Sequence, residues 1–256
     1  MDKAVIGGTG VYDLDNKNIS REVKTEYGRV KVDIINHYGE EIVFLARHGK
    51  NHSRAPHNIN YRANIKALEK LGIKYIYATA AVGSFNENYE PGDIVVIKDF
   101  IDFTKTRAQS FLDSEAESVK HFDMSDPYCK NMRSKFSKRS LAKQLKIKGN
   151  AVYVCTEGPR FETAAEIEMF KKLGGDVVGM TGVPEVILAK ELGICYASVA
   201  IITNWSTGMK DELDIHDFQE LISAKKAKIT EAFMHVFLEG LDQNNCSCGD
   251  SLIEIG

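Results

Sequence analysis

Five short segments combine glycine with hydroxyl, amide, carboxylate or basic side chains, and each borders an apolar run. The first is Gly7-Gly8-Thr9-Gly10. Its glycines would let backbone N–H groups approach an anion, and the Thr9 hydroxyl adds a donor. It is not a P-loop, because no Gly-Lys-Ser/Thr follows, and Asp13 stands where a dinucleotide-binding motif needs its third glycine. By itself the segment is better explained as an ordinary turn.

The second segment is Ala46-Arg47-His48-Gly49. Arginine suits planar, bidentate contact with phosphate, so Arg47 and His48 are candidate anion-binding residues. His48, His52 and His57 also raise the question of a metal site. We expect no metal, because Pro56 disfavours a helical histidine pair and no cysteine or acidic ligand is close by. The alternative is a solvated basic loop.

Polar residues recur at three further junctions. Glu162 lies in the segment 156–163, Thr181 in the segment 179–185, and Asn204 in Thr203-Asn204-Trp205-Ser206. A helix N-terminus with a threonine can bind an anion. Each segment also has a plain structural explanation: Glu162 as a helix-start carboxylate, Thr181 as an N-cap, and the third segment as a turn.

Strands and helices alternate along the chain, and they must position these segments. Apolar runs predict strands at 4–6, 75–82, 94–97, 152–155, 177–179 and 195–202, and a hairpin at 29–35 and 41–46. Helical spacing predicts helices at 60–71, 127–145, 163–173, 184–192 and 216–241, with a surface loop at 105–120. This order predicts one α/β domain over residues 1–256, with a central mixed β-sheet flanked by helices and a flexible tail at about 242–256. In such folds the ligand site lies where strands end in loops.

Composition excludes several functional classes. The net charge of −3 gives no reason to expect a nucleic-acid partner. No apolar run is long enough to cross a membrane, and the start of the chain lacks the pattern of a signal peptide. We therefore expect a soluble, cytoplasmic protein without a membrane partner.

The cysteines are odd in number, five, and lack zinc-ligand spacing. Cys129, Cys155 and Cys195 are expected as buried small hydrophobic residues in a reducing compartment. Cys246 and Cys248 are expected as free thiols in a flexible tail, and a strained or redox-active disulfide between them is the alternative.

Together, these segments resemble the trimeric purine nucleoside and methylthioadenosine phosphorylases. The resemblance runs from Gly7 to His216. It includes the following motifs: Asn60-Tyr61-Arg62-Ala63-Asn64, Val82-Gly83-Ser84, Pro91-Gly92-Asp93-Ile94, Asp126-Pro127-Tyr128-Cys129 and Thr156-Glu157-Gly158-Pro159-Arg160-Phe161. It implies a purine nucleoside phosphorylase-like fold, a homotrimer or a dimer of trimers, and no cofactor, with inorganic phosphate as a co-substrate.

The resemblance also implies roles for individual residues. Phosphate would lie against Thr9, Arg47, His48, the Ala80-Ala81 backbone and Thr181. Met180 would pack on the ribose, and Phe161, Trp205 and Ser206 would contact the substrate. Asn204 would donate its amide N–H to N7 of the base. Asn204 and His48 are the candidate catalytic residues.

Glu162 bears on which purine is bound. An ionised carboxylate only accepts hydrogen bonds, so Glu162 suits the N1–H of a 6-oxopurine and opposes the N1 acceptor of adenine. The family members that favour adenine look different here: serine replaces Glu162, and aspartates replace Asn204 and Ser206. We therefore expect phosphorolysis of inosine and guanosine, for purine salvage.

Two histidines concern the 5′ end of the substrate. His216 could bond a 5′-hydroxyl, where methylthio-specific members are apolar, or it could simply open the last helix. By resemblance, His121 reaches a neighbouring subunit's site, and its alternative is a plain surface histidine. A 5′-methylthioinosine or 5′-methylthioadenosine phosphorylase remains the alternative enzyme. A nucleoside- or phosphate-binding module without catalysis is the alternative outside enzymes, although every matched position holds a competent residue.

Overall fold

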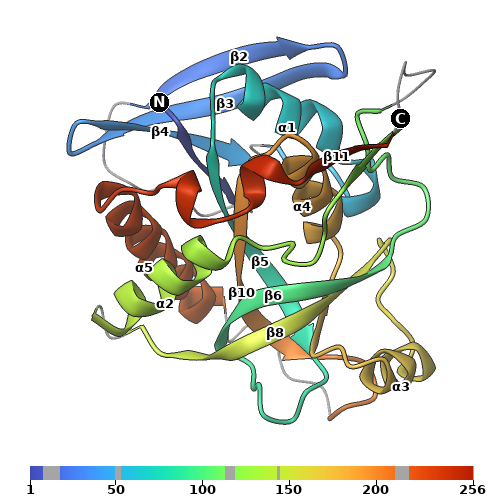
Figure 1. Cartoon of the computed structure of the whole chain (residues 1–256). Helices are drawn as coiled ribbons and strands as arrows, with labels where there is room; N and C mark the ends of the chain where they lie inside the picture. Colours follow the sequence, from blue (N-terminus) through green and yellow to red (C-terminus); the bar gives the residue numbers. More distant parts are fainter. Residues whose placement is uncertain (8–17, 50–52, 113–118, 143–144, 211–218, 256) are drawn as a thin grey trace.

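The computed structural model describes residues 1–7, 18–49, 53–112, 119–142, 145–210 and 219–255. A mixed sheet of nine strands organises this part of the chain, in the order β10-β6-β8-β9-β5-β1-β4-β3-β2. Because β10 also pairs with β5, the strands β5, β9, β8, β6 and β10 close on themselves. The expected α/β domain with a mixed sheet is confirmed (Figure 1).

The strands of this sheet are β1 (Lys3–Gly7), β2 (Ile19–Thr25), β3 (Gly28–His37), β4 (Glu40–Ala46), β5 (Tyr75–Ser84), β6 (Ile94–Phe103), β8 (Ile147–Thr156), β9 (Val177–Gly179) and β10 (Cys195–Trp205). A second, two-stranded sheet pairs β7 (Val119–Phe122) with β11 (Leu252–Ile255). The helices are α1 (Tyr61–Lys70), α2 (Lys130–Ala142), α3 (Ala164–Lys172), α4 (Gly182–Glu191) and α5 (Gln219–Leu238), with 3-10 turns η1 (Pro56–Asn58), η3 (Gln243–Asn245) and η4 (Cys248–Asp250).

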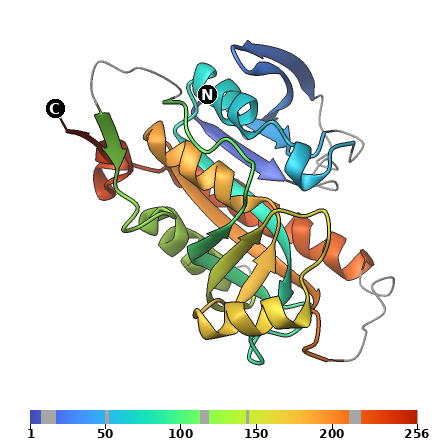
Figure 2. The same ribbon diagram turned by 90° about the vertical axis from the view of Figure 1, so that its right-hand side faces the viewer.

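Helices cover both faces of the large sheet. Apolar side chains of α1 and α4, such as Leu68 and Val186, join one core cluster, while those of α2 and α5, such as Phe136 and Phe233, join another. Figure 1 shows α2 and α5 together on one side and α1 and α4 on the other, and α3 lies at one end of the molecule in both views (Figures 1 and 2). Burial of these helix faces is the main stabilising contribution to the fold.

The predicted hairpin is present, and its turn explains its register. Strands β3 and β4 pair with His37 opposite Glu40, so Tyr38 and Gly39 form a two-residue turn. Both turn residues have positive φ, 50° and 86°, as the tight hairpin turns that match strand twist require. The structure adds β2, which the sequence pattern does not predict, because most of its side chains are exposed.

The C-terminal segment differs from the expected flexible tail. Residues 242–255 form η3, η4 and β11, and Cys248 is only 3% exposed. The Ser251 hydroxyl donates to the Lys190 carbonyl over 2.8 Å, and Ile253 pairs with His121 of β7. The buried Cys248 and the pairing of β11 with β7 attach this segment to the body of the protein. Among the described helices, none is both long and apolar enough to cross a membrane.

Candidate active site

The parallel strands β1, β4, β5 and β10 end at one edge of the sheet, and the candidate residues gather there. Gly7 pairs with Ala46, so the segments after β1 and β4 leave the sheet side by side. Strands β5 and β10 run in register from Tyr75 and Cys195 to Ala81 and Ile201. A bulge then leaves Thr203 unpaired and places Asn204 opposite Gly83. Parallel pairing thus brings together segments that are far apart in the sequence.

Arg47 lies directly after β4 and is held in one orientation by Glu185 of α4. Its Nε is 2.5 Å from Glu185 Oε1 and its second terminal nitrogen is 2.8 Å from Oε2. The other terminal nitrogen donates to the Thr79 carbonyl over 3.0 Å, and Tyr196 donates to Glu185 Oε2 over 2.8 Å. Three of the five guanidinium N–H groups are therefore used, which leaves two for a ligand.

Arg47 and Glu185 are both buried, at 4% and 0% exposure. Burial by itself lowers the pKa of the Arg47 guanidinium, but the charge and hydrogen bonds of Glu185 outweigh it, and the pKa is raised. Arg47 therefore stays charged at every relevant pH. Sequence reasoning did not include Glu185 among the site residues, although it ends the Gly179-to-Glu185 segment, because its partner lies 138 residues away.

His48 follows Arg47 and has a defined tautomer. Its Nδ1 lies 2.9 Å from the carbonyl oxygen of Arg54. Since a carbonyl only accepts, Nδ1 carries a proton, and Nε2 carries the second proton only when the ring is charged. The charged ring would donate to an anion through Nε2.

Thr181 begins α4, but its hydroxyl does not cap the helix. No side-chain cap bond forms there, whereas Thr163 caps α3 by accepting from the Glu166 N–H over 3.2 Å. The backbone N–H groups of Thr181 and Gly182 instead donate to the Tyr153 hydroxyl, over 3.1 and 3.4 Å. Burial raises the pKa of Tyr153, so this acceptor stays neutral. The Thr181 hydroxyl is left at a positive helix end, where an anion is stabilised.

Asn204 and Ser206 face the Gly83 backbone. The Asn204 Nδ2 lies 2.8 Å from the Trp205 carbonyl, which only accepts, so the amide orientation is fixed with its nitrogen on this side. Thr203 donates to Asn204 Oδ1 over 2.8 Å. A Cβ on Gly83 would lie 2.9 Å from Ser206 Oγ and 3.2 Å from Asn204 Nδ2. Ser206 Oγ is buried and has no hydrogen-bond partner among the described residues.

Glu162 lies beyond the end of β8 and is 7% exposed. One carboxylate oxygen, Oε1, accepts from the Thr156 hydroxyl over 2.6 Å. Since a carboxylate has about four acceptor positions, Glu162 can accept further hydrogen bonds. The neighbouring Phe161 differs, because its ring is 70% exposed and lies outside the buried part of the site.

Arg107 contacts two of the candidate segments, and sequence reasoning missed it. Its side chain is 2% exposed and donates to the carbonyls of Thr156, Glu157 and Met180, over 3.1, 2.6 and 2.7 Å. It therefore ties the segment leading to Glu162 to the segment carrying Met180. A single arginine in a segment of weak periodicity gave no signal. Together with His57–Arg62, residues 106–108 line a cavity of about 290 Å³.

The remaining candidates are spread over the same edge and beyond it. Met180 packs against Gly158, where a Cβ would approach its Sδ to 2.6 Å. Trp205 ends β10, and Lys210 Nζ lies 4.2 Å from its ring centroid. Ala80 and Ala81 lie on β5, while His121 is exposed on β7 in the separate small sheet. Thr9 and His216 lie outside the described residues.

The chain matches known proteins over nearly its whole length. The family model described as the phosphorylase superfamily matches residues 2–235. The chain is 46% identical over 256 residues to a 6-oxopurine nucleoside phosphorylase of Pyrococcus furiosus, covering 97% of both chains. It is also 46% identical over 250 residues to a probable S-methyl-5′-thioinosine phosphorylase of Methanopyrus kandleri, covering 97% and 96%.

Solved structures share the fold. A methylthioadenosine phosphorylase from an Antarctic soil metagenomic library superposes with a TM-score of 0.88 at 30% identity, covering 98% of this chain and 92% of the other. The methylthioadenosine phosphorylase of Schistosoma mansoni in complex with tubercidin gives a TM-score of 0.87 at 31% identity, covering 98% and 96%.

Proposed function

Because the chain belongs to the phosphorylase superfamily, we propose that it cleaves 6-oxopurine nucleosides with inorganic phosphate, giving the free base and ribose 1-phosphate. The 46% identity to a 6-oxopurine nucleoside phosphorylase over nearly the whole chain supports this activity. The observation that carries the choice of base is Glu162, a buried carboxylate held by Thr156. Such a group accepts from the N1–H of inosine or guanosine and opposes adenine N1.

The proposed phosphate site combines Arg47, His48, the Ala80-Ala81 backbone and Thr181, with Thr9. In support, Arg47 keeps two N–H groups after its bonds to Glu185 and Thr79, and the Thr181 hydroxyl stands unused at the start of α4. Glu185 offsets the charge of the buried Arg47 guanidinium, so the pair adds no net positive charge to the pocket before phosphate binds. Phosphate would then be oriented by directed hydrogen bonds rather than by net charge.

In the proposed reaction, a phosphate oxygen bonds to C1′ of the ribose as the C1′–N9 bond breaks. The electron pair stays on the purine, and the ribose passes through an oxocarbenium-like state that the adjacent anion stabilises. Asn204 has a second amide hydrogen besides the one given to Trp205, and we assign it to N7 of the leaving base. Ser206 Oγ lies beside it, Met180 and Trp205 would enclose the ribose and base, and Phe161 would contact the substrate from its exposed position.

The second candidate is a 5′-methylthioinosine phosphorylase, which keeps the same phosphate and base contacts. Equal identity to a probable enzyme of that name favours keeping it. The choice depends on the 5′ contacts of His216 and His121. With a histidine at position 216 we favour a 5′-hydroxyl, and therefore unmodified nucleosides.

We further propose that the protein acts in the cytoplasm, needs no cofactor, and works as a homotrimer or a dimer of trimers. The exposed position of His121 on the outlying β7–β11 sheet supports a contact with a neighbouring subunit.

Base release from inosine, measured with and without phosphate on fractions sized by light scattering, tests the proposed reaction and the proposed oligomer. Phosphate-dependent release confined to an oligomer would support them. Activity without phosphate would overturn the proposed reaction. A fully active monomer would overturn the proposed contact of His121 with a neighbouring subunit's site.

A further inference from the structure

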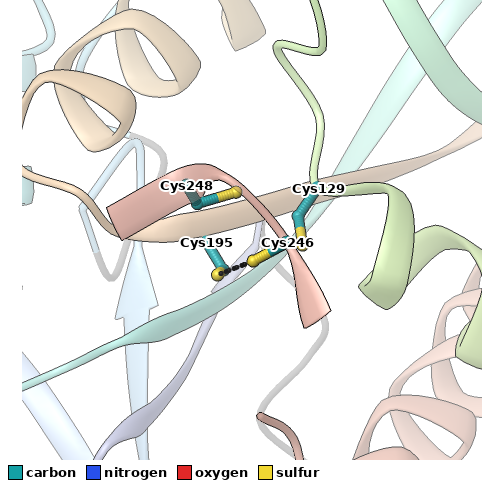
Figure 3. A group of neighbouring side chains, drawn as sticks. All are labelled: Cys129, Cys195, Cys246 and Cys248. Carbon is teal, nitrogen blue, oxygen red and sulfur yellow. Dashed lines mark hydrogen bonds between the residues drawn. The ribbon is translucent and has the colours of Figure 1, made fainter. Parts of the chain in front are cut away.

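Four of the five cysteines meet at the end of the sheet opposite the candidate active site (Figure 3). Cys129 precedes α2, Cys195 opens β10, Cys246 follows η3, and Cys248 opens η4. Their sulfur atoms all lie within 4.8 Å of one another, and Cys195 and Cys246 are 3.4 Å apart. Three of these side chains are buried, and Cys246 is partly exposed.

The arrangement fits a tetrahedral metal centre. Zinc binds four thiolates at about 2.3 Å, which places neighbouring sulfur atoms about 3.8 Å apart. The observed separations, 3.4 Å for one pair and under 4.8 Å for all, need only small side-chain rotations to reach this. Two disulfides would instead bring sulfurs together in pairs at about 2.0 Å, whereas all four cysteines are free and the Cys195 and Cys246 sulfurs are 3.4 Å apart. We propose that Cys129, Cys195, Cys246 and Cys248 bind one structural zinc ion.

Neighbouring groups support thiolate ligands. The side-chain amide of Gln243 lies 3.7 Å from Cys195 Sγ and also donates to the Gly193 carbonyl. The buried Lys190 interacts electrostatically with Cys248. Such outer contacts orient ligands, and Lys190 offsets part of the −2 charge of a zinc ion with four thiolates.

The ion would attach the C-terminal segment to the body of the protein. Two ligands come from residues 242–250, and the other two come from the starts of α2 and β10. Zinc binding would release the thiol protons to solvent and fix this segment, together with β11 and its partner β7. Sequence spacing does not predict this site, since its ligands join only through the fold.

Metal analysis of the reduced, anaerobically purified full chain tests the proposal. We expect close to one zinc per chain. Cobalt added to metal-free protein should give the absorption bands of tetrahedral cobalt thiolate. The Cys246→Ser variant should lose most of its zinc, whereas Cys155→Ala, which removes the cysteine outside the cluster, should keep it.

Two results would overturn the proposal. One is reduced wild-type protein that holds neither zinc nor cobalt. The other is protein isolated anaerobically in which mass spectrometry finds disulfides among the four cysteines. If Cys246→Ser does not fold, thiol labelling of the wild type decides: zinc should protect four thiols, and equal labelling with and without zinc would contradict the site.

Discussion

The guanidinium of Arg47 and the carboxylate of Glu185 form a buried, bidentate ion pair, with contacts of 2.5 and 2.8 Å, between the end of β4 and the first turn of α4. This pair links the segment that carries His48 to the helix that Thr181 begins. It fixes which N–H groups of Arg47 remain for the proposed contact with phosphate. The proposed phosphate site therefore depends on a residue that need not touch phosphate.

Replacing Glu185 with glutamine should damage both stability and phosphate binding. Removing one partner of a buried pair costs about 3–5 kcal/mol, because the other charge is left uncompensated. Arg47 would also lose its fixed plane, and we expect the KM for phosphate to rise about ten-fold, or about 1.4 kcal/mol. Urea unfolding at one protein concentration and phosphate kinetics measure the two effects.

The control is Glu22→Gln, which breaks the pair with Arg29, where the Arg29 and Glu22 side chains are 68% and 45% exposed. An exposed pair contributes at most about 1 kcal/mol, and phosphate kinetics should not change. Equal costs for the two variants would contradict the role given to Glu185.

Thr181 and Thr163 offer a matched comparison, since both begin helices and only Thr163 caps its helix. Thr181→Val should raise the KM for phosphate about ten- to a hundred-fold, as expected for a lost hydrogen bond to a charged group. It should change the free energy of unfolding by under about 0.5 kcal/mol, because no cap is lost. Thr163→Val should do the reverse, with a stability cost of about 1 kcal/mol and an unchanged KM. If Thr181→Val affected stability alone, the hydroxyl would not belong to the phosphate site.

Glu162→Gln tests the base contact. The amide can donate to adenine N1, so the ratio of kcat/KM for inosine to that for adenosine should fall about ten- to a hundred-fold. Glu166→Gln makes the same chemical change in the capping box of α3, where Glu166 pairs with Arg160 on the surface. That control should leave the ratio unchanged. An unchanged ratio in Glu162→Gln would sink the assignment.

Gly83→Ala tests the arrangement of Asn204 and Ser206. The added Cβ would approach Ser206 Oγ to 2.9 Å and Asn204 Nδ2 to 3.2 Å, so both groups must move. We expect kcat/KM for inosine to fall at least about ten-fold, since small displacements of positioning groups are costly. Gly249→Ala, where a Cβ meets nothing within 4 Å, is the control and should behave like the wild type. Full activity of Gly83→Ala would place the base elsewhere.

Local pattern was enough to predict most elements and to place the candidate residues at the ends of strands. Apolar runs predicted the buried strands, and polar segments at their ends indicated Arg47, Asn204 and Glu162. Contacts between distant segments were not predictable in this way. Glu185 finds Arg47 across 138 residues, and Arg107 lies in a segment without periodicity. The packing of residues 242–255 was missed for the same reason, because Cys248 meets Cys129 and Cys195 only in the folded chain.

The most direct test of the proposed function compares initial rates on inosine, adenosine, 5′-methylthioinosine and 5′-methylthioadenosine, each with and without phosphate. The account predicts phosphate-dependent cleavage with the highest kcat/KM for inosine. A preference for 5′-methylthioinosine would keep the roles of Arg47 and Glu162 and overturn the 5′ assignment of His216. A preference for either adenine nucleoside, or cleavage that does not need phosphate, would contradict the central claim.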